Sequence, residues 1–472
     1  MTDYIDFLKS KQHEVIDVGF EPSRPINSKL FDWQQDITRW GLRRGTAALF
    51  EDCGLGKTPQ QLEWANHVAD YTSGRVLIVT PLAVAPQTKR EGEKFGIEAR
   101  ICRAQSDTAK GLNITNYEML EHFDLKKFDG IVLDESSILK AYMGKTKRYL
   151  VEKCKNIPYR LCCTATPAPN DHMELLNHAE FLGIMRSSEA LSIWFINDTK
   201  NSGTYRLKKH AIKSFWEWVS SWAVCLRNPA DLGYSADGYV LPKLNTVEHI
   251  LGVSEIDTNF EDGFIRKVET SATAFHKEKR HTAVARAGET ADIVKQDNEQ
   301  HLVWCNTDYE ADLLKKYIPD AVEVRGSHKT EYKERTALDF VDGNIRALIS
   351  KPKIFGFGLN FQNCHNTEFC GLDYSYESYY QAIRRLLRFG QKYEVNCHIV
   401  LGSTEKHILD VMRRKEAQQN EMHAEMYSEI TDIQKRKFHG HAFKLSLETP
   451  KITVPNWVRS ENGIYNRHVQ SI

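Results

Sequence analysis

The sequence predicts an α/β protein with two tandem lobes of parallel sheet flanked by helices and a helical insertion between them. Short runs rich in Val, Ile and Leu are each followed by loop residues and a helical pattern, which is typical of buried parallel strands. These runs form two groups, one before residue 170 and one after residue 300. The length of 472 residues also exceeds the ~250–300 residues at which a single core stops growing.

The predicted elements follow in order along the chain. Examples of the predicted strands are residues 46–50, 76–80, 130–134 and 160–164 in the first group and 301–305, 346–350, 369–373 and 395–401 in the second. Residues 181–241 are rich in aromatic side chains and lack the strand rhythm, so we expect a helical insertion there. Residues 241–244 are predicted to be an extended connector, because proline disfavours helix at and before its position. Residues 412–437 alternate charged and amide side chains, which indicates a solvated helix.

Composition excludes several classes of protein. Hydrophobic residues make up 41% and charged residues 27% of the chain, too apolar for a disordered protein. No apolar run approaches the ~20 residues of a membrane helix, and the first residues lack the layout of a signal peptide. The ten cysteines form no CxxC pair, so we expect a reducing, cytoplasmic location. Basic and acidic residues balance at 63 each, which excludes a globally basic nucleic-acid binder but not a local basic groove.

A glycine-rich loop, Glu-Asp-Cys-Gly-Leu-Gly-Lys-Thr at residues 51–58, directly follows the first predicted strand. Glycines let successive backbone N–H groups reach phosphate oxygens, and a following helix adds its dipole. Lys57 is expected to reach the terminal phosphates and Thr58 to bind Mg²⁺. Because Glu51 replaces the first glycine of the strict pattern, a plain glycine turn is the alternative. The candidate nucleotide-binding residues of this loop are Asp52, Cys53, Gly54, Leu55, Gly56, Lys57 and Thr58.

Two adjacent carboxylates, Asp134 and Glu135, end another predicted strand. Such a pair suits Mg²⁺ coordination by Asp134 and polarisation of an attacking water by Glu135. The alternative is a strand end solvated by acidic residues. A third strand ends in Thr-Ala-Thr-Pro at residues 164–167, whose hydroxyls could bridge the carboxylates to moving parts; an ordinary turn explains that segment equally well.

Arginines gather in the second half of the chain, in the segment QAIRRLLRFGQ at residues 381–391. Arg385 and Arg388 lie three residues apart and are expected to share a helix face. Arginine binds phosphate bidentately and can stabilise charge on a transferring phosphoryl group. An exposed basic helix is the alternative interpretation.

In this order, GLGKT, DESS, TATP, GFGLN at residues 356–360 and QAIRRLLRFGQ resemble the motifs of superfamily 2 helicases. Within that superfamily they look like the Swi/Snf-type ATPases (DEAD/DEAH-box helicase-like), and the short chain is similar to phage-encoded members. The resemblance spans residues 28–405. It implies two RecA-like lobes with ATP and Mg²⁺ in the cleft between them and DNA across both.

The resemblance also implies roles for single residues. Gln34 resembles the adenine-sensing glutamine, and Gly358 and Gln381 match positions that sense nucleotide. Arg388 is the candidate arginine finger, with Arg385 beside it. Contacts to nucleic acid are implied for Pro81, Thr115, Asn116, Tyr117 and Asn360.

Three residues depart from the family pattern. Arg384 replaces a small residue, often glycine, before the first motif arginine, so its local packing is open. Gln87 stands where family members often carry tryptophan, and Cys53 replaces methionine or alanine. None of these changes removes a group needed for hydrolysis.

The predicted organisation has five parts. They are an N-terminal segment (1–27), an ATP-binding lobe (28–180), an insertion and connector (181–245), a helicase C-terminal lobe (246–433) and a basic tail (434–472). The tail has seven basic and two acidic residues, so it either contacts DNA or caps a lobe.

The predicted function is an ATP-dependent DNA translocase or helicase that binds duplex DNA without sequence preference, in replication, recombination or repair. The alternatives are a strand-separating DNA or RNA helicase and a nucleotide-gated DNA-binding module with a vestigial ATPase. We expect no interaction with membranes, and the sequence does not identify a protein partner.

Overall fold

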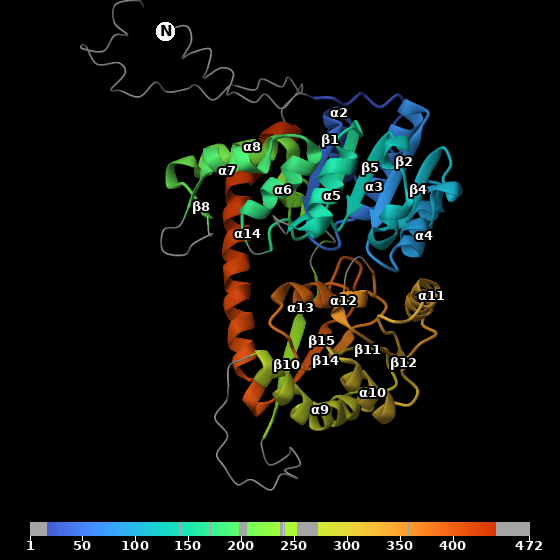
Figure 1. Ribbon diagram of the computed structural model, residues 1–472, viewed down its shortest axis with the longest axis vertical. Helices are drawn as coiled ribbons and strands as arrows, with labels where there is room; N and C mark the ends of the chain where they lie inside the picture. The colour runs from blue at the N-terminus through green and yellow to red at the C-terminus, as the bar shows by residue number, and fades with distance from the viewer. Residues whose placement is uncertain are drawn as a thin grey trace, which may run out of the picture.

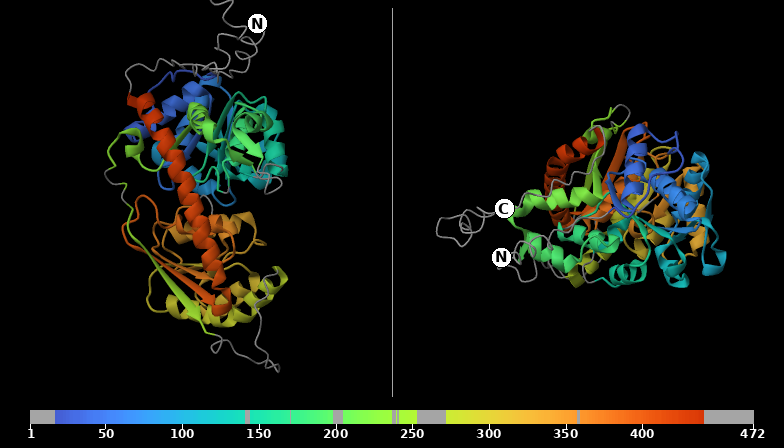
Figure 2. Two further views of the ribbon diagram at one scale, coloured as in Figure 1. Left: turned by 90° about the vertical axis from the view of Figure 1, so that its left-hand side faces the viewer. Right: turned by 90° about the horizontal axis from the view of Figure 1, so that it is seen from above.

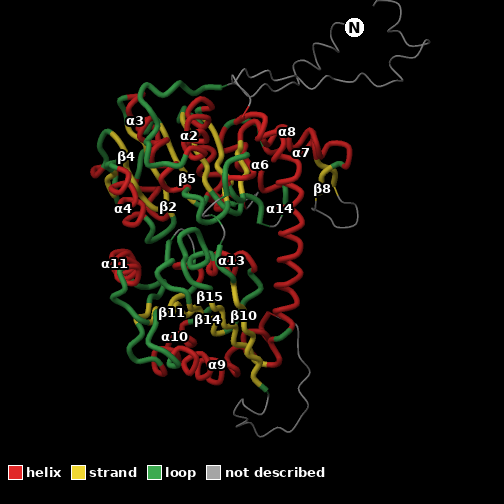
Figure 3. Tube along the Cα trace, turned by 180° about the vertical axis from the view of Figure 1, so that it is seen from behind, coloured by secondary structure: helices red, strands yellow, loops and turns green. Residues whose placement is uncertain are grey.

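The computed structural model describes residues 17–439, apart from 141–143, 170, 198–204, 237–238, 240, 253–271 and 357–358. Two lobes are stacked along the longest axis, each built on one sheet with helices on both sides (Figures 1 and 3). The sheets have seven and six strands in the described part of the chain, and all pairings within them are parallel. The predicted fold class, α/β with two tandem lobes of parallel sheet flanked by helices, is confirmed.

The first sheet has the order β3-β4-β2-β5-β6-β1-β9. Its strands are β1 (Thr46–Glu51), β2 (Arg75–Thr80), β3 (Ala99–Ile101), β4 (Gly111–Asn116), β5 (Gly130–Asp134), β6 (Tyr159–Cys163) and β9 (Ala223–Leu226). Every residue of β1 and β5 is buried, as expected for central strands covered on both faces. Because β1, β5 and β6 run parallel, the loops that follow them emerge at the same edge of the sheet.

Helices cover both faces of the first sheet. One face packs against α2 (Asp32–Arg44), α3 (Lys57–Thr72) and α4 (Ala85–Phe95). The other packs against α5 (Lys145–Cys154), α6 (Met173–Leu182), α7 (Ser187–Trp194) and α8 (Ile212–Trp222). An antiparallel pair, β7 (Phe195–Asn197) and β8 (Tyr205–Leu207), follows α7. The short 3₁₀ helices are η1 (Gln105–Asp107), η2 (Tyr117–His122), η3 (Leu125–Lys127), η4 (Ser136–Lys140), η5 (Lys209–Ala211), η6 (Pro229–Leu232) and, in the second lobe, η8 (Ser403–Glu405).

The segment predicted as an insertion is helical but completes the first lobe. The aromatic residues of α8, including Phe215, Trp216 and Trp222, are buried in the first lobe's core. The strand β9 that follows pairs with the second half of β1 and so joins the first sheet. A helix that carries this many buried rings needs a sheet face to cover, which the first lobe provides.

The second sheet has the order β10-β15-β14-β11-β13-β12. Its strands are β10 (Leu244–Leu251), β11 (His301–Trp304), β12 (Val322–Glu323), β13 (Ala347–Ser350), β14 (Asn366–Cys370) and β15 (Val395–Gly402). One face packs against α9 (Ala272–Val294) and α10 (Asp308–Tyr317). The other packs against α11 (Thr330–Val341), α12 (Pro352–Phe355), α13 (Tyr376–Ile383) and the start of α14 (His407–His439).

Seven of the eight predicted strands start within one residue of the observed ones, and the eighth is wrong by three residues. That strand, β14, begins at Asn366 instead of residue 369. Its polar start is buried because Thr367 Oγ1 donates to Leu302 O at 2.8 Å and Glu368 pairs with His301 at 2.8 Å. The predicted extended connector at 241–244 leads into β10, which begins at Leu244 and pairs with β15 along eight residues.

The long helix α14 contains the predicted segment 412–437, but it is not solvated throughout. It starts against the second lobe, where Ile408 and Leu409 are buried, and runs alongside both lobes (Figures 1 and 2). Farther along, Tyr427 and Ile430 are buried in the core of the first lobe. The predicted lobe boundary at residue 433 therefore cuts a helix that packs on both lobes, and residues 440–472 of the predicted tail lie outside the described residues.

None of the helices in the described part of the chain has the length and apolar character that a membrane span requires.

Candidate active site between the lobes

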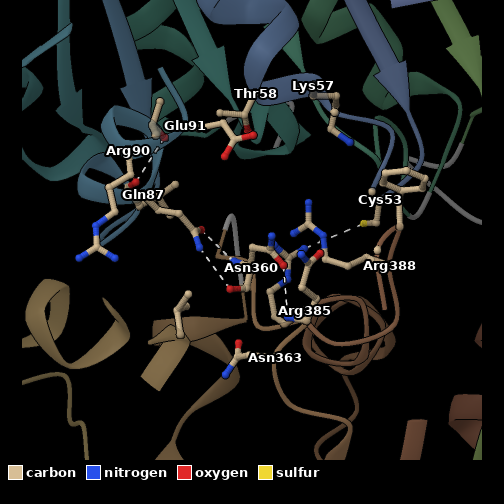
Figure 4. A pocket seen from close by; sticks show the side chains of 18 of the residues that line it. Cys53, Lys57, Thr58, Gln87, Arg90, Glu91, Asn360, Asn363, Arg385 and Arg388 are labelled. Carbon is tan, nitrogen blue, oxygen red and sulfur yellow. Dashed lines mark hydrogen bonds between the residues drawn. The ribbon is translucent and has the colours of Figure 1, made fainter. Parts of the chain in front are cut away.

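A cavity of about 800 Å³ lies between the two lobes. Figure 4 shows Lys57 and Thr58 on its first-lobe side and Arg385 and Arg388 on its second-lobe side. The predicted site residues that line it are Cys53, Gly54, Gly56, Lys57, Thr58, Asp134, Glu135, Asn360, Arg385 and Arg388. Residues from strands far apart in the sequence thus meet at one place, as expected where parallel strands end.

The glycine-rich loop between β1 and α3 requires glycine at two positions. Gly54 has φ 88° and Gly56 has φ 76°, a left-handed conformation that other residues rarely adopt. A Cβ on Gly54 would lie 2.5 Å from the backbone nitrogen of Phe389 in the second lobe. The loop therefore lets the second lobe approach closely and leads directly into the N-terminus of α3 at Lys57. A helix N-terminus of this kind favours phosphate.

Lys57 is held at the base of the loop. Its Nζ donates to the backbone oxygens of Glu51 at 2.7 Å and Asp52 at 3.0 Å. The Glu51 side chain is fully buried beneath it and accepts a hydrogen bond from Gln60 Nε2 at 2.8 Å. Burial raises the pKa of Glu51 to about 7, while Lys57 and Gln60 oppose the shift. Glu51 departs from the strict loop pattern because it ends a buried strand and does not belong to the exposed turn.

The two carboxylates at the end of β5, Asp134 in the strand and Glu135 directly after it, are both buried. Burial raises the pKa of Asp134 to about 7, and the charge of Glu135 adds to the shift. Glu135 has φ 52°, an unfavourable conformation for a residue with a Cβ. Backbone strain of this kind clusters at functional sites, where surrounding structure imposes it. Here it turns the Glu135 side chain toward the second lobe, with Oε1 at 3.9 Å from Arg385 Nη2.

The segment 164–167 connects these carboxylates to the second lobe, as predicted for its hydroxyl groups. Thr164 Oγ1 donates to Glu135 Oε2 at 3.3 Å and accepts from the Thr166 backbone nitrogen at 3.1 Å. Gln381 Nε2 donates to Thr166 Oγ1 at 3.1 Å across the lobe boundary. Gln381 in turn accepts from Arg385 at its Oε1, at 2.8 Å. Gln381 is therefore a bridge between the lobes and does not itself line the cavity.

The two motif arginines are fixed by backbone oxygens. Arg385 Nη1 donates to Leu359 O at 2.9 Å and Arg388 Nη1 to the same oxygen at 3.3 Å. Burial and the like charge of Arg385 lower the pKa of Arg388 to about 10. The two guanidinium groups repel each other, and among the described residues no carboxylate lies within hydrogen-bond distance of either one. An anion bound between the lobes would therefore be favoured at this site.

The comparisons with known proteins agree with this arrangement for the second lobe. Residues 286–390 match the family described as the helicase conserved C-terminal domain. This match runs from within α9 to the segment after α13, so it covers the central part of the second lobe. No curated protein matches the chain. Among solved structures, the Sulfolobus solfataricus SWI2/SNF2 ATPase core in complex with dsDNA is similar at 17% sequence identity and a TM-score of 0.41, with 89% of this chain and 99% of that chain covered.

The match includes the residues that the second lobe contributes to the cavity. Asn360, Arg385 and Arg388 all lie within the helicase C-terminal domain, as does Gln381. The glycine-rich loop of the first lobe lines the same cavity from the opposite side. The similarity to phage-encoded members gains no support from these matches.

Several predicted nucleotide-binding residues lie behind the cavity wall. Gln34 is buried, donates from Nε2 to Leu55 O at 2.9 Å and accepts from the Phe31 backbone nitrogen at 3.0 Å. It therefore supports the glycine-rich loop, and its contact with adenine stays a prediction. Leu55 and Asp52 do not line the cavity, and Gly358 lies outside the described residues.

The first-lobe candidates for nucleic-acid contact have structural partners. Tyr117 Oη donates to Asp134 O at 2.8 Å, and Asn116 accepts from the Met119 backbone nitrogen at 3.1 Å. Thr115 is buried, and Pro81 is half-buried at the end of β2. Nucleic-acid contact by these residues stays a prediction, with Pro81 and Tyr117 the two that are only partly buried.

One contact of the cavity was missed as a functional candidate. Gln87 on α4 donates to Asn360 O at 3.2 Å and accepts from Asn360 N at 2.9 Å (Figure 4). This amide pair joins the first lobe to the helicase C-terminal domain. The only signal in the sequence was that Gln87 stands where related chains carry tryptophan, a departure that by itself names no role.

Proposed function

We propose that the protein is a Mg²⁺-dependent ATPase that moves along duplex DNA by opening and closing the cleft between its lobes. The observation that carries this proposal is the meeting of Lys57, the Asp134–Glu135 pair and two arginines at one cavity between the lobes. Phosphoryl transfer to water needs cations around the phosphates, a carboxylate for the metal and one for the water. The cavity supplies each of these groups.

The residues present fit Mg²⁺ and a nucleoside triphosphate. A cavity of about 800 Å³ is within the ~300–1,000 Å³ range of small-molecule sites. Among the described residues no cluster of three or more metal-ligating His, Cys, Asp or Glu side chains occurs. Magnesium usually keeps few protein ligands and takes the rest from phosphate and water. Thr58 and Asp134 are the side chains that would hold it, and bound ATP would supply the phosphoryl group.

Each side chain then has a defined task. Lys57 would exchange its hydrogen bonds to two loop carbonyls for bonds to phosphate oxygens. The exchange is favourable because a charged phosphate binds an ammonium group more strongly than a neutral carbonyl does. Glu135 would orient the water and accept its proton, held in place by Thr164. Arg388 would stabilise negative charge that develops on the phosphoryl group. Because it reaches across from the second lobe, it would act only when the cleft is closed.

Movement along DNA requires that closure at the cavity be passed to both lobes. The hydrogen-bond path from Glu135 through Thr164 and Thr166 to Gln381 provides such a connection. The duplex DNA in the Sulfolobus solfataricus complex is bound by that protein, and binding of duplex DNA by this chain is part of the proposal.

The test is phosphate release with duplex, single-stranded and forked DNA and with RNA. We expect turnover to rise most with duplex DNA and to vary little with sequence, because contacts to phosphates carry no sequence information. Equal basal turnover with every nucleic acid would contradict the coupling to DNA. No turnover at all would instead favour the nucleotide-gated binding module.

A second assay separates a translocase from a strand-separating helicase. A motor that tracks along duplex should displace a triplex-forming third strand and unwind a simple fork weakly or not at all. Opening base-pair steps costs ~1.4 kcal/mol each on average, so unwinding without a wedge relies on thermal fraying. Efficient fork unwinding without third-strand displacement would reverse the choice.

A further inference from the structure

Arg384 lies next to Arg385 in the sequence but faces a different part of the molecule. Arg385 lines the 800 Å³ cavity, whereas Arg384 lines a second cavity of about 310 Å³. This second cavity is lined by both lobes and by the middle of α14, with Asp52 and Tyr380 in its wall. Arg384 is therefore not placed to meet the phosphates beside Arg385.

The partners of Arg384 form a closed cycle across the lobe boundary. Arg384 Nη2 donates to Asp52 Oδ2 at 2.8 Å, and Arg384 Nε donates to Tyr380 Oη at 3.1 Å. Tyr380 Oη donates to Asp52 Oδ1 at 3.1 Å, and that oxygen also accepts from the Cys53 backbone nitrogen at 2.7 Å. Both carboxylate oxygens of Asp52, in the glycine-rich loop, are thus held by α13 and the residue that follows it.

Low exposure should strengthen this contact relative to the other hydrogen-bonded ion pairs between the lobes. The side chains of Arg384 and Asp52 are 15% and 22% exposed. Burial alone would lower the pKa of Arg384, yet Asp52 shifts it upward overall, as expected for a close pair of opposite charge. Exposed pairs contribute little, because water and salt screen them.

The other charged contacts across the boundary that lie within hydrogen-bond distance each include a more exposed basic side chain. The side chains of Arg90 and Asp342 are 45% and 46% exposed, and those of Arg103 and Glu334 are 38% and 10% exposed. Lys140 and Glu377 also pair, with the lysine 37% exposed. Arg385 is buried but lies 3.9 Å from Glu135, beyond hydrogen-bond distance. Removing the Arg384 pair should therefore weaken closure more than removing any one of these exposed pairs.

We propose that Arg384 is a positioning residue that holds the two lobes closed through Asp52 and Tyr380, independently of nucleotide. The closed state would then exist before ATP arrives, with Arg385 and Arg388 already facing the glycine-rich loop. A ligand that needs the closed state binds with an affinity reduced by the fraction of molecules that are open. The pair would thus set the apparent affinity for nucleotide without taking part in hydrolysis. The nucleotide arm of this proposal rests on the proposed ATPase function, and the closure arm does not.

The closure arm is tested by energy transfer between two dyes without nucleotide. Dyes go on Glu152→Cys in α5 and Lys316→Cys in α10, which are exposed on opposite lobes. All ten native cysteines are buried, and a Cys53→Ala background removes the one that lines the cavity between the lobes, so labelling is selective. We expect Arg384→Gln and Asp52→Asn to lower transfer efficiency, and the double variant to be no worse than either single one. Because α14 packs on both lobes, the change should be a shift in distance and not full separation.

The nucleotide arm is tested by steady-state kinetics. Arg384→Gln should raise the KM for ATP about tenfold to a hundredfold and leave kcat within about twofold, since saturating ATP restores closure. Arg384→Lys should recover part of the loss, because lysine keeps the charge toward Asp52 but cannot also bond Tyr380. Tyr380→Phe should have a smaller effect in the same direction. Arg346→Gln is the matched control, since Arg346 pairs with Asp320 inside the second lobe.

Two results would overturn the proposal. Unchanged transfer efficiency in both Arg384→Gln and Asp52→Asn would show that the pair does not hold the lobes closed. A fall in kcat of about 10³-fold with KM unchanged would make Arg384 an arginine finger instead. If the wild-type protein fails to hydrolyse ATP, the proposed function is lost, while the energy-transfer result still decides whether Arg384 closes the cleft.

Discussion

The two lobes are built on the same kind of sheet but present their charged groups to the cleft in different ways. In the first lobe the backbone does the positioning: Gly54, Gly56 and Glu135 all have positive φ, and Lys57 is held by loop carbonyls. In the second lobe the charged groups are positioned by long side chains, because Arg385 and Arg388 reach the cleft from the segment after α13. The first lobe therefore offers a fixed cradle and the second offers charges whose position depends on closure.

This difference has a functional consequence. A cradle fixed by local backbone conformation should make its own contacts to phosphate in the open state as well, and closure of the lobes should add to the affinity for nucleotide. Arginines that act across the boundary should affect the chemical step, because they reach the same place only in the closed state. Substitutions in the first lobe's loop, in the second lobe's arginines and in the helix that joins the lobes should therefore have different effects.

Loss of the cradle's cation should have the largest effect. Lys57→Ala removes the loop side chain that can exchange backbone oxygens for phosphate, and we expect ATP turnover to be abolished. Phosphate release and equilibrium nucleotide binding measure this, with Lys153→Ala on the exposed face of α5 as the control. Near-normal turnover in the Lys57 variant would refute the assignment of the loop.

Loss of the second lobe's arginine should be next. Arg388→Ala should lower kcat by about 10³-fold and leave nucleotide affinity nearly unchanged, because the charge acts on the transition state. Arg346→Ala, on the far side of the same lobe, is the control. A variant that loses affinity but keeps kcat would place Arg388 with the cradle.

Burial of Glu51 below the first lobe's loop should make the free energy of unfolding depend on pH. Its pKa rises from the ordinary 4.5 to about 7 in the folded protein, chiefly through burial. The folded state thus keeps a proton that the unfolded state loses between these values, so stability is full below pH 4.5 and falls as pH rises to 7. At about 1.4 kcal/mol per pKa unit, the fall amounts to roughly 3 kcal/mol.

Glu51→Gln should remove this dependence. Chemical denaturation of both proteins at pH 5 and pH 8 measures it, and the variant should gain stability relative to the wild type at the higher pH. An identical change in free energy of unfolding for both proteins would mean that Glu51 ionises without cost.

The smallest expected effect concerns the helix that joins the lobes. Gln434 of α14 accepts from the Cys225 backbone nitrogen at 2.9 Å and donates to Cys225 O at 3.1 Å, so it caps the free edge of β9. Gln434→Leu should lower the free energy of unfolding by about 1–2 kcal/mol, since it leaves both strand groups unpaired. Denaturation midpoints measure it, with the exposed Gln418→Leu as the control. An unchanged midpoint would show that α14 is held by its apolar contacts alone.

Local patterns predicted most of the strands and the loop residues of the site. Runs such as 130–134 are apolar on both faces, and the glycine-rich loop needs only neighbouring residues to form its shape. Strand β14 was misplaced because its first residues are polar, and they are buried only through bonds to β11. The membership of β9 in the first sheet was missed for a similar reason, since its four residues carry no sign of which sheet they join.

Residue identity and spacing by themselves determined that Lys57, Asp134, Glu135, Arg385 and Arg388 carry charge at the ends of strands or helices. Tertiary structure alone decided which of them face the same cavity. It turned Arg384 toward Asp52 in a second cavity, joined Gln87 to Asn360, placed Gln34 behind the loop and packed α14 on both lobes. These contacts link residues tens to hundreds of positions apart. Local sequence fixes backbone conformation over a few residues, whereas the pairing of distant side chains depends on how the two lobes pack.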